Sequence, residues 1–385
     1  MMCDCKLFLI RNNFLVAATY VKVPHELILS FTSSFSWEHT DTMGFINRSL
    51  ITCLIIILVF TNTRPISCEK DDDPMRERYR KWMAKYNRTH KDDNQREKRF
   101  QIYKANVELI EAFNAINDDY KLTDNKFADI TNAEFRKRYM GLKGSSSRVP
   151  LLDIKQNEEH SEKAREMLEA VPEKIDWRKK GAVSEVRDQG PCGACWAFSA
   201  VAAIEGITKI KSGRMVALSE QELVDCNMID DGCYGGLMTD AFDFVRLNGG
   251  ITTQSDYPYQ GQQGECKTSK LDHHAATIKG YRNVTVNEQS LLKAVASQPV
   301  SVGIDASSMA FQFYTNGVFT GPCGVELNHG VTIVGYDTDG KNKYWIAKNS
   351  WGAGWGESGY MRMKRGVEGN LGLCGITTLA SYPVV

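Results

Sequence analysis

The chain has 385 residues, 42% of them hydrophobic and 24% charged, and its 47 Lys and Arg residues balance 47 Asp and Glu residues. This is the composition of a globular protein with enough apolar material for one large core or two smaller ones. The balanced charge argues against a nucleic-acid partner, because binding to phosphates needs a clustered excess of positive charge.

The N-terminal stretch contains a pattern typical of a secretory signal peptide. Met43 is followed by one positive charge, an apolar run over Leu50–Phe60 and a small residue at Ser67. The run is too short to span a bilayer. We therefore assign residues 43–68 to a signal peptide and predict no stable membrane anchor. Residues 1–42 show no recognisable element, and we interpret them as an extension of the gene model. The alternative is a genuine N-terminal tail that makes the apolar run an internal anchor.

Residues 69–144 are predicted to form a helical domain. Apolar residues recur at helical spacing over Met75–Tyr86 and over Gln95–Asn117, and such stripes usually pack on a neighbouring element. The stretch Asn125–Phe135 predicts a short strand or turn. Asp129 or Thr131, both within it, is a candidate cap for the helix that follows. Residues 145–170 are mostly polar, which predicts an exposed linker that contains the activation cleavage region.

Residues 171–385 are predicted to form a second domain, because the composition changes at Val171. Helices are expected after Cys195, over Leu218–Cys226 with Ser219 and Glu222 as a capping box, and over Thr239–Asn248. Strands are expected at Val300–Ile304, His329–Tyr336, Tyr344–Lys348 and Gly359–Met363. Helices followed by strands predict an α+β fold with two lobes, and a cleft between lobes is a usual place for a site.

The cysteines point to a nucleophile. Four of the eleven lie at or before Cys68, and the other seven begin with Cys192. Seven is odd, so three bridges would leave one thiol free. In Cys192-Gly-Ala-Cys195 the turn residues stand just before a small, apolar, helix-compatible run. Cys195 is therefore expected at a helix N-terminus, where the helix dipole favours a thiolate. The alternative, a redox or zinc pair, is weakened because the chain has no second Cys-x-x-Cys.

A cysteine nucleophile needs a base, and the base needs an orienting group. Past residue 171 the histidines are His273, His274 and His329. The first two sit in a polar stretch and are expected on the surface, whereas His329 begins an apolar strand. Asn349 is the candidate orienter, and Trp351 can shield its bond to the imidazole from water. The amide of Gln189, six residues before Cys195, is a candidate donor to an oxyanion.

Together these motifs resemble the papain-like cysteine proteases, and within them the plant cathepsin-L-like enzymes of the senescence-associated type. The resemblance extends from about Tyr79 to Val385. It implies a papain-like fold, with a helical lobe and a β-barrel-like lobe, preceded by an inhibitory pro-domain. It implies Cys195 and His329 as a thiolate–imidazolium pair, with Asn349 as orienter and Gln189 in the oxyanion hole. It also implies the bridges Cys192–Cys233, Cys226–Cys266 and Cys323–Cys374.

The chain departs from the family pattern at a few positions. The pro-region signature of six residues has Gln95 and Tyr103 where glutamate and phenylalanine are usual, and Thr123 replaces a glycine. In the second domain, Tyr234 stands beside the cleft where asparagine is frequent. These departures affect how tightly the pro-domain inhibits and how substrate binds, rather than the chemistry.

The resemblance also implies the substrate-binding residues and a preference for a bulky hydrophobic side chain two residues before the cut. Gly235 and Gly236 are implied to bind the substrate backbone, with Asn328 and Trp351 beside them. The implied specificity pocket comprises Leu237, Met238, Gly303, Leu327, Gly330 and Leu379. For the nucleophile, a neighbouring imidazolium and a helix N-terminus are expected to lower the thiol pKa from ~8.5 to roughly 3.5–7.5.

The expected protein is thus an endopeptidase zymogen of the vacuole, a lysosome-like compartment or the extracellular space, without cofactor or metal. Its partners would be protein and peptide substrates, its own pro-domain and cystatin-type inhibitors, and it is expected to be a monomer. Asn87 and Asn283 are glycosylation acceptors. The alternatives are a binding protein on an inactive protease scaffold, a pro-region that inhibits other proteases in trans, and a different Cys-His enzyme that transfers acyl or amide groups.

Overall fold

A computed structural model describes residues 7–11, 14–23, 26–30, 73–143 and 171–385. The predicted signal peptide (43–68) and the predicted linker (145–170) lie outside the described residues. The chain divides into two compact units, residues 1–71 and 72–385, which are described separately. Among the described residues, no helix has the length and apolar character needed to cross a membrane.

The first unit contains a three-stranded antiparallel sheet formed by β1 (Leu7–Arg11), β2 (Phe14–Val23) and β3 (Glu26–Ser30). The prediction that the residues before Met43 form no recognisable element was therefore wrong. The registers pair Arg11 with Phe14 and Val23 with Glu26, so each connection has the length of a tight hairpin. The strands are rich in β-branched and aromatic residues, which favour this structure.

The second unit begins with the three helices of the pro-region, which we define as residues 73–143: α2 (Pro74–Lys85), α3 (Asp93–Ile116) and α4 (Asn132–Tyr139). The first two begin and end within two residues of their predicted bounds. Their N-caps are Asp73 and Asp92, whose carboxylates accept hydrogen bonds from the backbone of the first turn. Thr131, and not Asp129, caps α4, where it forms a capping box with Glu134.

Helix α4 is held against α3 by charge and by backbone contacts. The guanidinium of Arg99 donates to both carboxylate oxygens of Glu134, at 2.8 and 2.7 Å, and this ion pair holds the pKa of Glu134 at about 2. The buried amide of Asn106 donates to the carbonyls of Ala128 and Ile130. The long helix therefore fixes the place from which the chain leaves α4.

The helical lobe of the second domain contains α6 (Cys195–Ser212), α7 (Glu220–Cys226), α8 (Met238–Leu247) and the short 3₁₀ helices η2 (Gly232–Tyr234) and η3 (Thr268–Lys270). All three α-helices were predicted. Ser219 caps α7 as expected, but the carboxylate of Glu222 accepts from Thr252 N at 2.7 Å. The predicted capping box is therefore only half formed, because Glu222 instead ties α7 to the segment after α8.

The other lobe is built on one mixed sheet with the strand order β4-β8-β11-β10-β9-β7-β12-β6, and β5 pairs with β9 at its side. The strands predicted from the sequence are β7 (Val300–Ile304), β9 (His329–Asp339), β10 (Asn342–Lys348) and β11 (Tyr360–Lys364). The sequence analysis missed β4 (Tyr120–Leu122), β5 (Ile175–Asp176), β6 (Gly280–Asn283), β8 (Tyr314–Phe319), β12 (Ala380–Val384), α9 (Glu288–Ser297), α10 (Met309–Phe313) and η4 (Leu373–Gly375).

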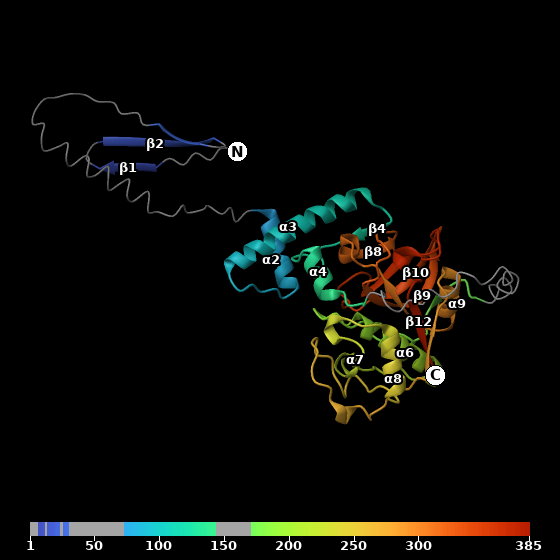
Figure 1. The fold of residues 1–385 in the computed structure, drawn as a ribbon. Coiled ribbons are helices and arrows are strands. Elements are labelled where there is room, and N and C mark those ends of the chain that lie inside the picture. The colour runs from blue at the N-terminus through green and yellow to red at the C-terminus, as the bar shows by residue number, and fades with distance from the viewer. Residues whose placement is uncertain (1–6, 12–13, 24–25, 31–72, 144–170) are drawn as a thin grey trace, which may run out of the picture. The chain divides into compact units, whose positions relative to one another are not determined.

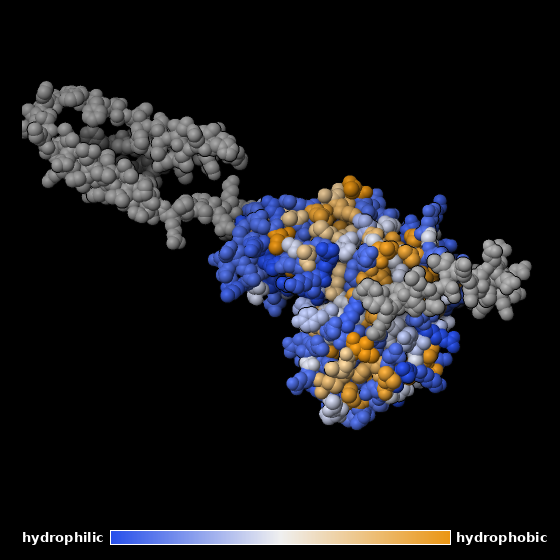
Figure 2. Space-filling view, viewed as in Figure 1, coloured by the Kyte–Doolittle hydropathy of each residue, from blue (hydrophilic) through white to orange (hydrophobic). Residues whose placement is uncertain are grey.

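Figure 1 shows helices α6, α7 and α8 grouped below the sheet that contains β9 and β10, with α4 leading from α2 and α3 toward the junction. Two clusters of buried residues correspond to the two lobes, so the predicted α+β architecture with two lobes is observed. On the face shown in Figure 2, hydrophilic residues dominate the surface over α2. The apolar side of that helix, including Tyr79 and Trp82, is buried.

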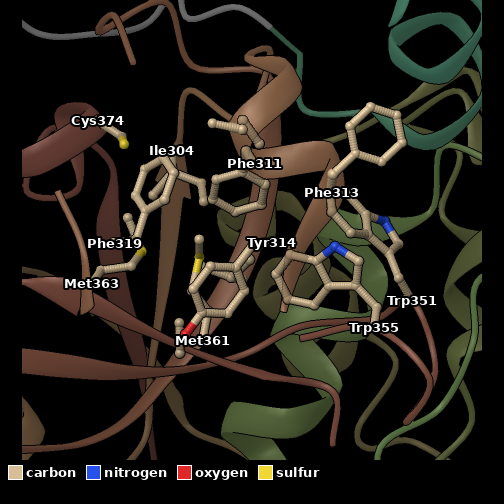
Figure 3. Packing of buried hydrophobic residues seen from close by; sticks show 14 of the residues in the cluster. Ile304, Phe311, Phe313, Tyr314, Phe319, Trp351, Trp355, Met361, Met363 and Cys374 are labelled. Carbon is tan, nitrogen blue, oxygen red and sulfur yellow. The ribbon is translucent and has the colours of Figure 1, made fainter. Parts of the chain in front are cut away.

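The core of the sheet lobe is rich in aromatic rings and extends into the pro-region. Phe311, Trp351 and Trp355 pack against one another, with centroids 5.0 to 5.8 Å apart, as Figure 3 shows. Two pro-region rings, Phe127 and Phe135, meet Trp351 edge-on at 5.6 and 5.1 Å. The pro-region and the sheet lobe therefore share one core, and β4 adds its strand to the same sheet by pairing with β8.

Three disulfides close loops of the second domain: Cys192–Cys233, Cys226–Cys266 and Cys323–Cys374. These are the pairs implied by the family resemblance. Within the described part of the chain Cys195 is the free cysteine, and it is buried. The bridge at Cys192 ties the segment before α6 to η2, which precedes the glycines predicted to bind substrate.

Replacing Thr131 by alanine removes the side-chain half of the α4 capping box. We expect a loss of about 1 kcal/mol in the local stability of this helix, and therefore faster exchange of its amide hydrogens, by about fivefold. Native-state hydrogen exchange of the precursor measures this directly. Lys137→Ala, an exposed change on the same helix, is the matched control and should leave the exchange rates nearly unchanged. Equal protection of α4 in both variants would show that the cap does not hold the helix.

Candidate active site

Cys195 is the first residue of α6 and follows the N-cap residue Ala194. The turn before it is fixed by the Cys192–Cys233 bridge and by a hydrogen bond from Gly193 N to Cys233 O at 2.9 Å. The thiol therefore lies at the positive end of the helix dipole, as predicted from the sequence. Cys195 is completely buried.

His329 is the first residue of β9 and is also completely buried. Its Nε2 lies 2.8 Å from Asn349 Oδ1, and the N–H of Ser350 donates to the same oxygen. Because this oxygen is an acceptor, the proton of the neutral imidazole lies on Nε2, and Nδ1 is left as the acceptor. The ring of Trp351 stacks on the imidazole, with centroids 4.5 Å apart and planes 27° apart. These contacts fix the tautomer and orientation of the ring.

Strand β9 brings His329 to the start of α6. A Cβ atom built on Gly330, the residue after His329, would lie 3.2 Å from the carbonyl oxygen of Cys195. The absence of a side chain at Gly330 allows this approach. The predicted nucleophile and the predicted base therefore occupy one site at the junction of the two lobes.

Gln189 lies beside this site and is completely buried. Its Oε1 accepts from the hydroxyl of Ser350 at 2.6 Å, which leaves Nε2 as the donor. That donor contacts the carbonyl oxygens of Cys192 at 2.7 Å and of Tyr139 at 3.1 Å. The amide expected to stabilise an oxyanion is therefore bound to a carbonyl at the end of α4.

The pro-segment, residues 139–143, runs from the last residue of α4 across the site. Gly236 N donates to Gly141 O at 2.9 Å, Lys143 N donates to Gly236 O at 3.2 Å, and Leu142 N donates to Asn328 O at 3.1 Å. Leu142 and Gly236 form a parallel β-bridge. The pro-segment thus uses the backbone of Gly236 and Asn328, two of the residues predicted to bind substrate.

Leu142 occupies the predicted specificity pocket. A Cβ atom built on Gly303 would lie 2.8 Å from Leu142 Cδ2, 3.2 Å from Leu327 Cδ1 and 3.3 Å from Leu379 Cβ. Leu142 belongs to the same buried cluster as Met238, and Leu237 packs against that cluster. Gly330 lies next to Met238, since a Cβ atom built on Gly330 would lie 3.3 Å from Met238 Sδ. The structure therefore brings Leu142, Leu327 and Leu379 together at Gly303, and Met238 against Gly330.

Gly141 passes unusually close to the start of α6. A Cβ atom built on it would lie 1.8 Å from the carbonyl oxygen of Gly193, and one built on Gly235 would lie 2.7 Å from Gly141 O. Glycine is required at these positions because the two backbones touch. The sequence analysis did not identify Tyr139, Gly141 or Leu142 as site residues. A glycine next to a leucine after a helix is too common a pattern to indicate such a role.

Burial under the pro-segment determines the protonation of the two central groups. Desolvation raises the pKa of the Cys195 thiol to about 11 and lowers the pKa of His329 to about 4. Both shifts favour the neutral thiol and the neutral imidazole in the precursor. The lowered thiol pKa expected from the sequence is therefore not found in the closed precursor, because water is excluded from both groups.

Several other residues singled out in the sequence are exposed. Asn87 and Asn283, the glycosylation acceptors, are exposed, which is the accessibility that glycosylation requires. His273 and His274 are exposed as well, in agreement with their interpretation as surface residues. Tyr234 is 90% exposed beside Gly235.

Two family profiles match the chain. The profile described as papain family cysteine protease matches residues 171–384, and the cathepsin propeptide inhibitor domain (I29) matches residues 79–135. The senescence-specific cysteine protease SAG39 of Oryza sativa subsp. indica is 47% identical over 342 residues, which cover 87% of this chain and 97% of the relative. Vignain of Vigna mungo is 50% identical over 325 residues, covering 82% and 88%.

Solved structures of precursors resemble the whole of the second unit. A recombinant stem bromelain precursor superimposes with a TM-score of 0.74 at 46% identity, covering 81% of this chain and 99% of that one. The proform of the Amb a 11 cysteine protease, a major ragweed pollen allergen, gives a TM-score of 0.71 at 40% identity, covering 82% and 96%. Both similarities include the pro-region as well as the second domain.

Replacing Gly141 by alanine should open the site without touching the catalytic groups. The added methyl group cannot fit against Gly193, so the pro-segment must shift and water must reach Cys195. The thiol pKa then falls from about 11, and each unit of the fall increases the thiolate fraction about tenfold. We expect alkylation of Cys195 by iodoacetamide in the intact precursor at pH 8 to accelerate by about tenfold or more.

Gly354→Ala is the matched control, because no atom lies within 4 Å of the position that its Cβ would occupy. Its alkylation rate should equal that of the unmodified precursor. If Gly141→Ala alkylates no faster than Gly354→Ala, the close approach at Gly193 does not keep the site closed.

Proposed function

The chain belongs to the papain family of cysteine proteases and is a peptide hydrolase with an inhibitory pro-domain, and we propose that Cys195, His329, Asn349 and Gln189 carry out its catalysis. The observation that supports this proposal best is the course of the pro-segment. It crosses Cys195, contacts the donor of Gln189 and fills the adjoining apolar pocket with Leu142. An inhibitory segment is expected to cover the place where substrate reacts.

In the active enzyme, Cys195 and His329 form a thiolate–imidazolium pair. The thiolate attacks the carbonyl carbon of the peptide bond, and the carbonyl oxygen becomes an oxyanion that accepts from Gln189 Nε2 and from the Cys195 N–H. The imidazolium transfers its proton to the leaving nitrogen, the C–N bond breaks, and a thioester to Cys195 remains. Water then attacks the thioester, His329 accepts its proton, and the acid product leaves as the thiolate forms again.

Asn349 and Trp351 support the imidazolium. Asn349 Oδ1 accepts from Nε2 whether the ring is neutral or charged, so the ring keeps its orientation while Nδ1 gains and loses the proton. Trp351 covers this hydrogen bond with its stacked indole. A hydrogen bond to a charged donor is stronger where water does not compete for it.

Activation consists of removing the pro-segment. Once residues 139–143 leave, water reaches Cys195 and His329, and the desolvation that holds the thiol pKa at about 11 is relieved. The helix dipole and the neighbouring imidazolium then favour the thiolate. We propose that cleavage occurs in residues 145–170, that the mature domain begins near Val171, and that Gly235 and Gly236 then bind the substrate backbone.

The substrate preference follows from the pocket around Leu142. Its walls are leucine and methionine side chains with glycine at Gly303 and Gly330, so it accepts a bulky apolar side chain and offers no carboxylate to a basic one. We propose that this pocket receives the residue two positions before the cut, in endopeptidase cleavage.

The cellular context is proposed from the sequence. The signal-like segment, residues 43–68, directs the chain into the secretory pathway, to a vacuole or lysosome-like compartment or to the outside. Asn87 and Asn283 are glycosylated there. The mature enzyme is a monomer that cystatin-type inhibitors block by entering the same cleft.

The first experiment acidifies the purified precursor and labels it with a thiol-directed peptidyl epoxide. Mass spectrometry then locates the label and the new N-terminus. We expect the label on Cys195 and a chain that starts near Val171. Cys195→Ser should abolish both labelling and processing, because a hydroxyl at this position is a far weaker nucleophile. Label spread over several cysteines, or peptidase activity in Cys195→Ser, would remove Cys195 from the role of nucleophile.

Substrate preference is measured with a library of fluorogenic peptides that vary only in the residue two positions before the cut. Leucine and phenylalanine should give higher kcat/KM than arginine, since burying an apolar side chain contributes about 1.5–3 kcal/mol and the pocket provides no partner for a charge. The control varies the residue immediately before the cut in the same way. A library that favours arginine at the tested position would contradict the assignment of the pocket.

A further inference from the structure

A cluster of buried charged side chains lies behind the catalytic residues, at the junction of the lobes. Arg187 forms ion pairs with Glu205 of α6 and with Glu220 of α7. Lys348, at the end of β10, donates to the hydroxyl of Ser184 at 2.9 Å, and that hydroxyl donates to Glu205. Lys348 is the residue before Asn349, so the cluster reaches the orienting asparagine.

A small cavity separates the cluster from the catalytic residues. Its volume is about 20 Å³, which is enough for one water molecule. Its lining includes Arg187 and Glu220 of the cluster as well as Gly330, Asn349 and Ser350. The cavity therefore joins the buried charges to the residues that surround His329.

Two polar atoms of this lining have no hydrogen-bond partner among the described residues. They are Asn349 Nδ2 and Glu220 Oε2, and their residues are only 4% and 2% exposed. Buried polar atoms of proteins nearly always have a partner, and an ordered water supplies one where the protein does not. One atom is a donor and the other an acceptor, so a single water can satisfy both.

We propose that Glu220 is a positioning residue for the catalytic His329, acting through a water molecule in this cavity that accepts from Asn349 Nδ2 and donates to Glu220 Oε2. The proposal rests on the catalytic roles assigned above. Glu220 does not touch the substrate or the reacting atoms. It acts on the amide of Asn349, whose opposite end holds the imidazole.

Two effects follow from this arrangement. First, the acceptor at Glu220 adds to the Ser350 N–H in fixing the amide of Asn349 with Oδ1 toward His329, because the reversed amide would present a donor to the imidazolium. Second, burial raises the pKa of Glu220 to about 7 although Arg187 opposes this shift. Above that pH the carboxylate contributes negative charge near the amide, which favours the imidazolium over the neutral ring. The other titratable groups that face Glu220 are Arg187, Glu205, Lys348 and Tyr259, and a substitution at Glu220 leaves these residues in place.

Glu220→Gln in the full chain, activated by acidification, tests the proposal. The removal of negative charge lowers the pKa of the imidazolium, so the alkaline limb of the pH profile moves to lower pH. We expect this limb to shift by about half a unit or more and kcat to fall by about tenfold, with KM nearly unchanged. The profile is measured twice, by peptide hydrolysis and by alkylation of Cys195 with iodoacetamide, which needs no substrate.

Glu222→Gln is the matched control. Glu222 lies on the same helix and is buried as well, but its carboxylate accepts from Thr252 N and from the amide of Asn248 instead of lining the cavity. It should reduce stability without moving the alkaline limb. An unshifted limb in Glu220→Gln, or equal shifts in the two variants, would overturn the role of Glu220.

A crystal structure of the unmodified full chain tests the water directly and does not depend on whether a variant folds. Electron density for a water within hydrogen-bond distance of both Asn349 Nδ2 and Glu220 Oε2 is expected, and an empty cavity would overturn the proposal. If the unmodified chain neither hydrolyses peptides nor alkylates at Cys195 after activation, the proposed catalytic roles fail instead.

Discussion

Gly141 lies against the carbonyl oxygen of Gly193 with no room for even a methyl group between them. This approach brings the pro-segment within hydrogen-bond distance of Gly236 and Asn328, and it removes water from the thiol and the imidazole below. Burial makes a charged thiolate and a charged imidazolium both unfavourable. The pro-segment therefore inhibits the precursor electrostatically as well as sterically. Cys195 and His329 already lie at one site, where burial keeps both groups neutral.

Trp351 links the burial of His329 to the folding of the pro-region, because it contacts both. One face of the indole covers His329, and its edges meet Phe127 and Phe135 of the pro-region. The ion pair between Arg99 and Glu134 and the cap at Thr131 hold those aromatic residues in place. The contacts that fold the pro-region therefore also keep the catalytic ring covered. Inhibition depends on a folded domain, and not on the short segment in the cleft alone.

The candidate catalytic residues could be found from the sequence because each stands at a position with its own local signal. Turn residues precede Cys195 and an apolar helix follows it; an apolar strand follows His329. The α2 and α3 helices were found from their periodicity to within two residues. By contrast, β8 and β12 gave no clear alternation, because buried and exposed residues do not alternate regularly along these strands.

Other features depended on tertiary contacts that no local pattern encodes. Glu222 has the spacing of a capping box, yet the backbone of Thr252 offers it a buried donor, and that contact prevails. The role of Leu142 depends on where α4 ends relative to a pocket built from residues 237–379. The expected fall of the thiol pKa was derived from the helix and the imidazolium, whereas burial in the precursor outweighs both.

The pairing of β4 with β8 has a consequence for the enzyme after maturation. In the precursor β4 is the outermost strand of the sheet, and its loss leaves β8 with a free edge. Free edges invite pairing with other chains, which leads to aggregation. Two features limit this: β8 bends at Gly317, where φ is +98°, and the Gly317 N–H already donates to the carboxylate of Glu357. Both features are already present in the precursor, so the edge of β8 is a poor site for pairing with another chain once β4 is absent.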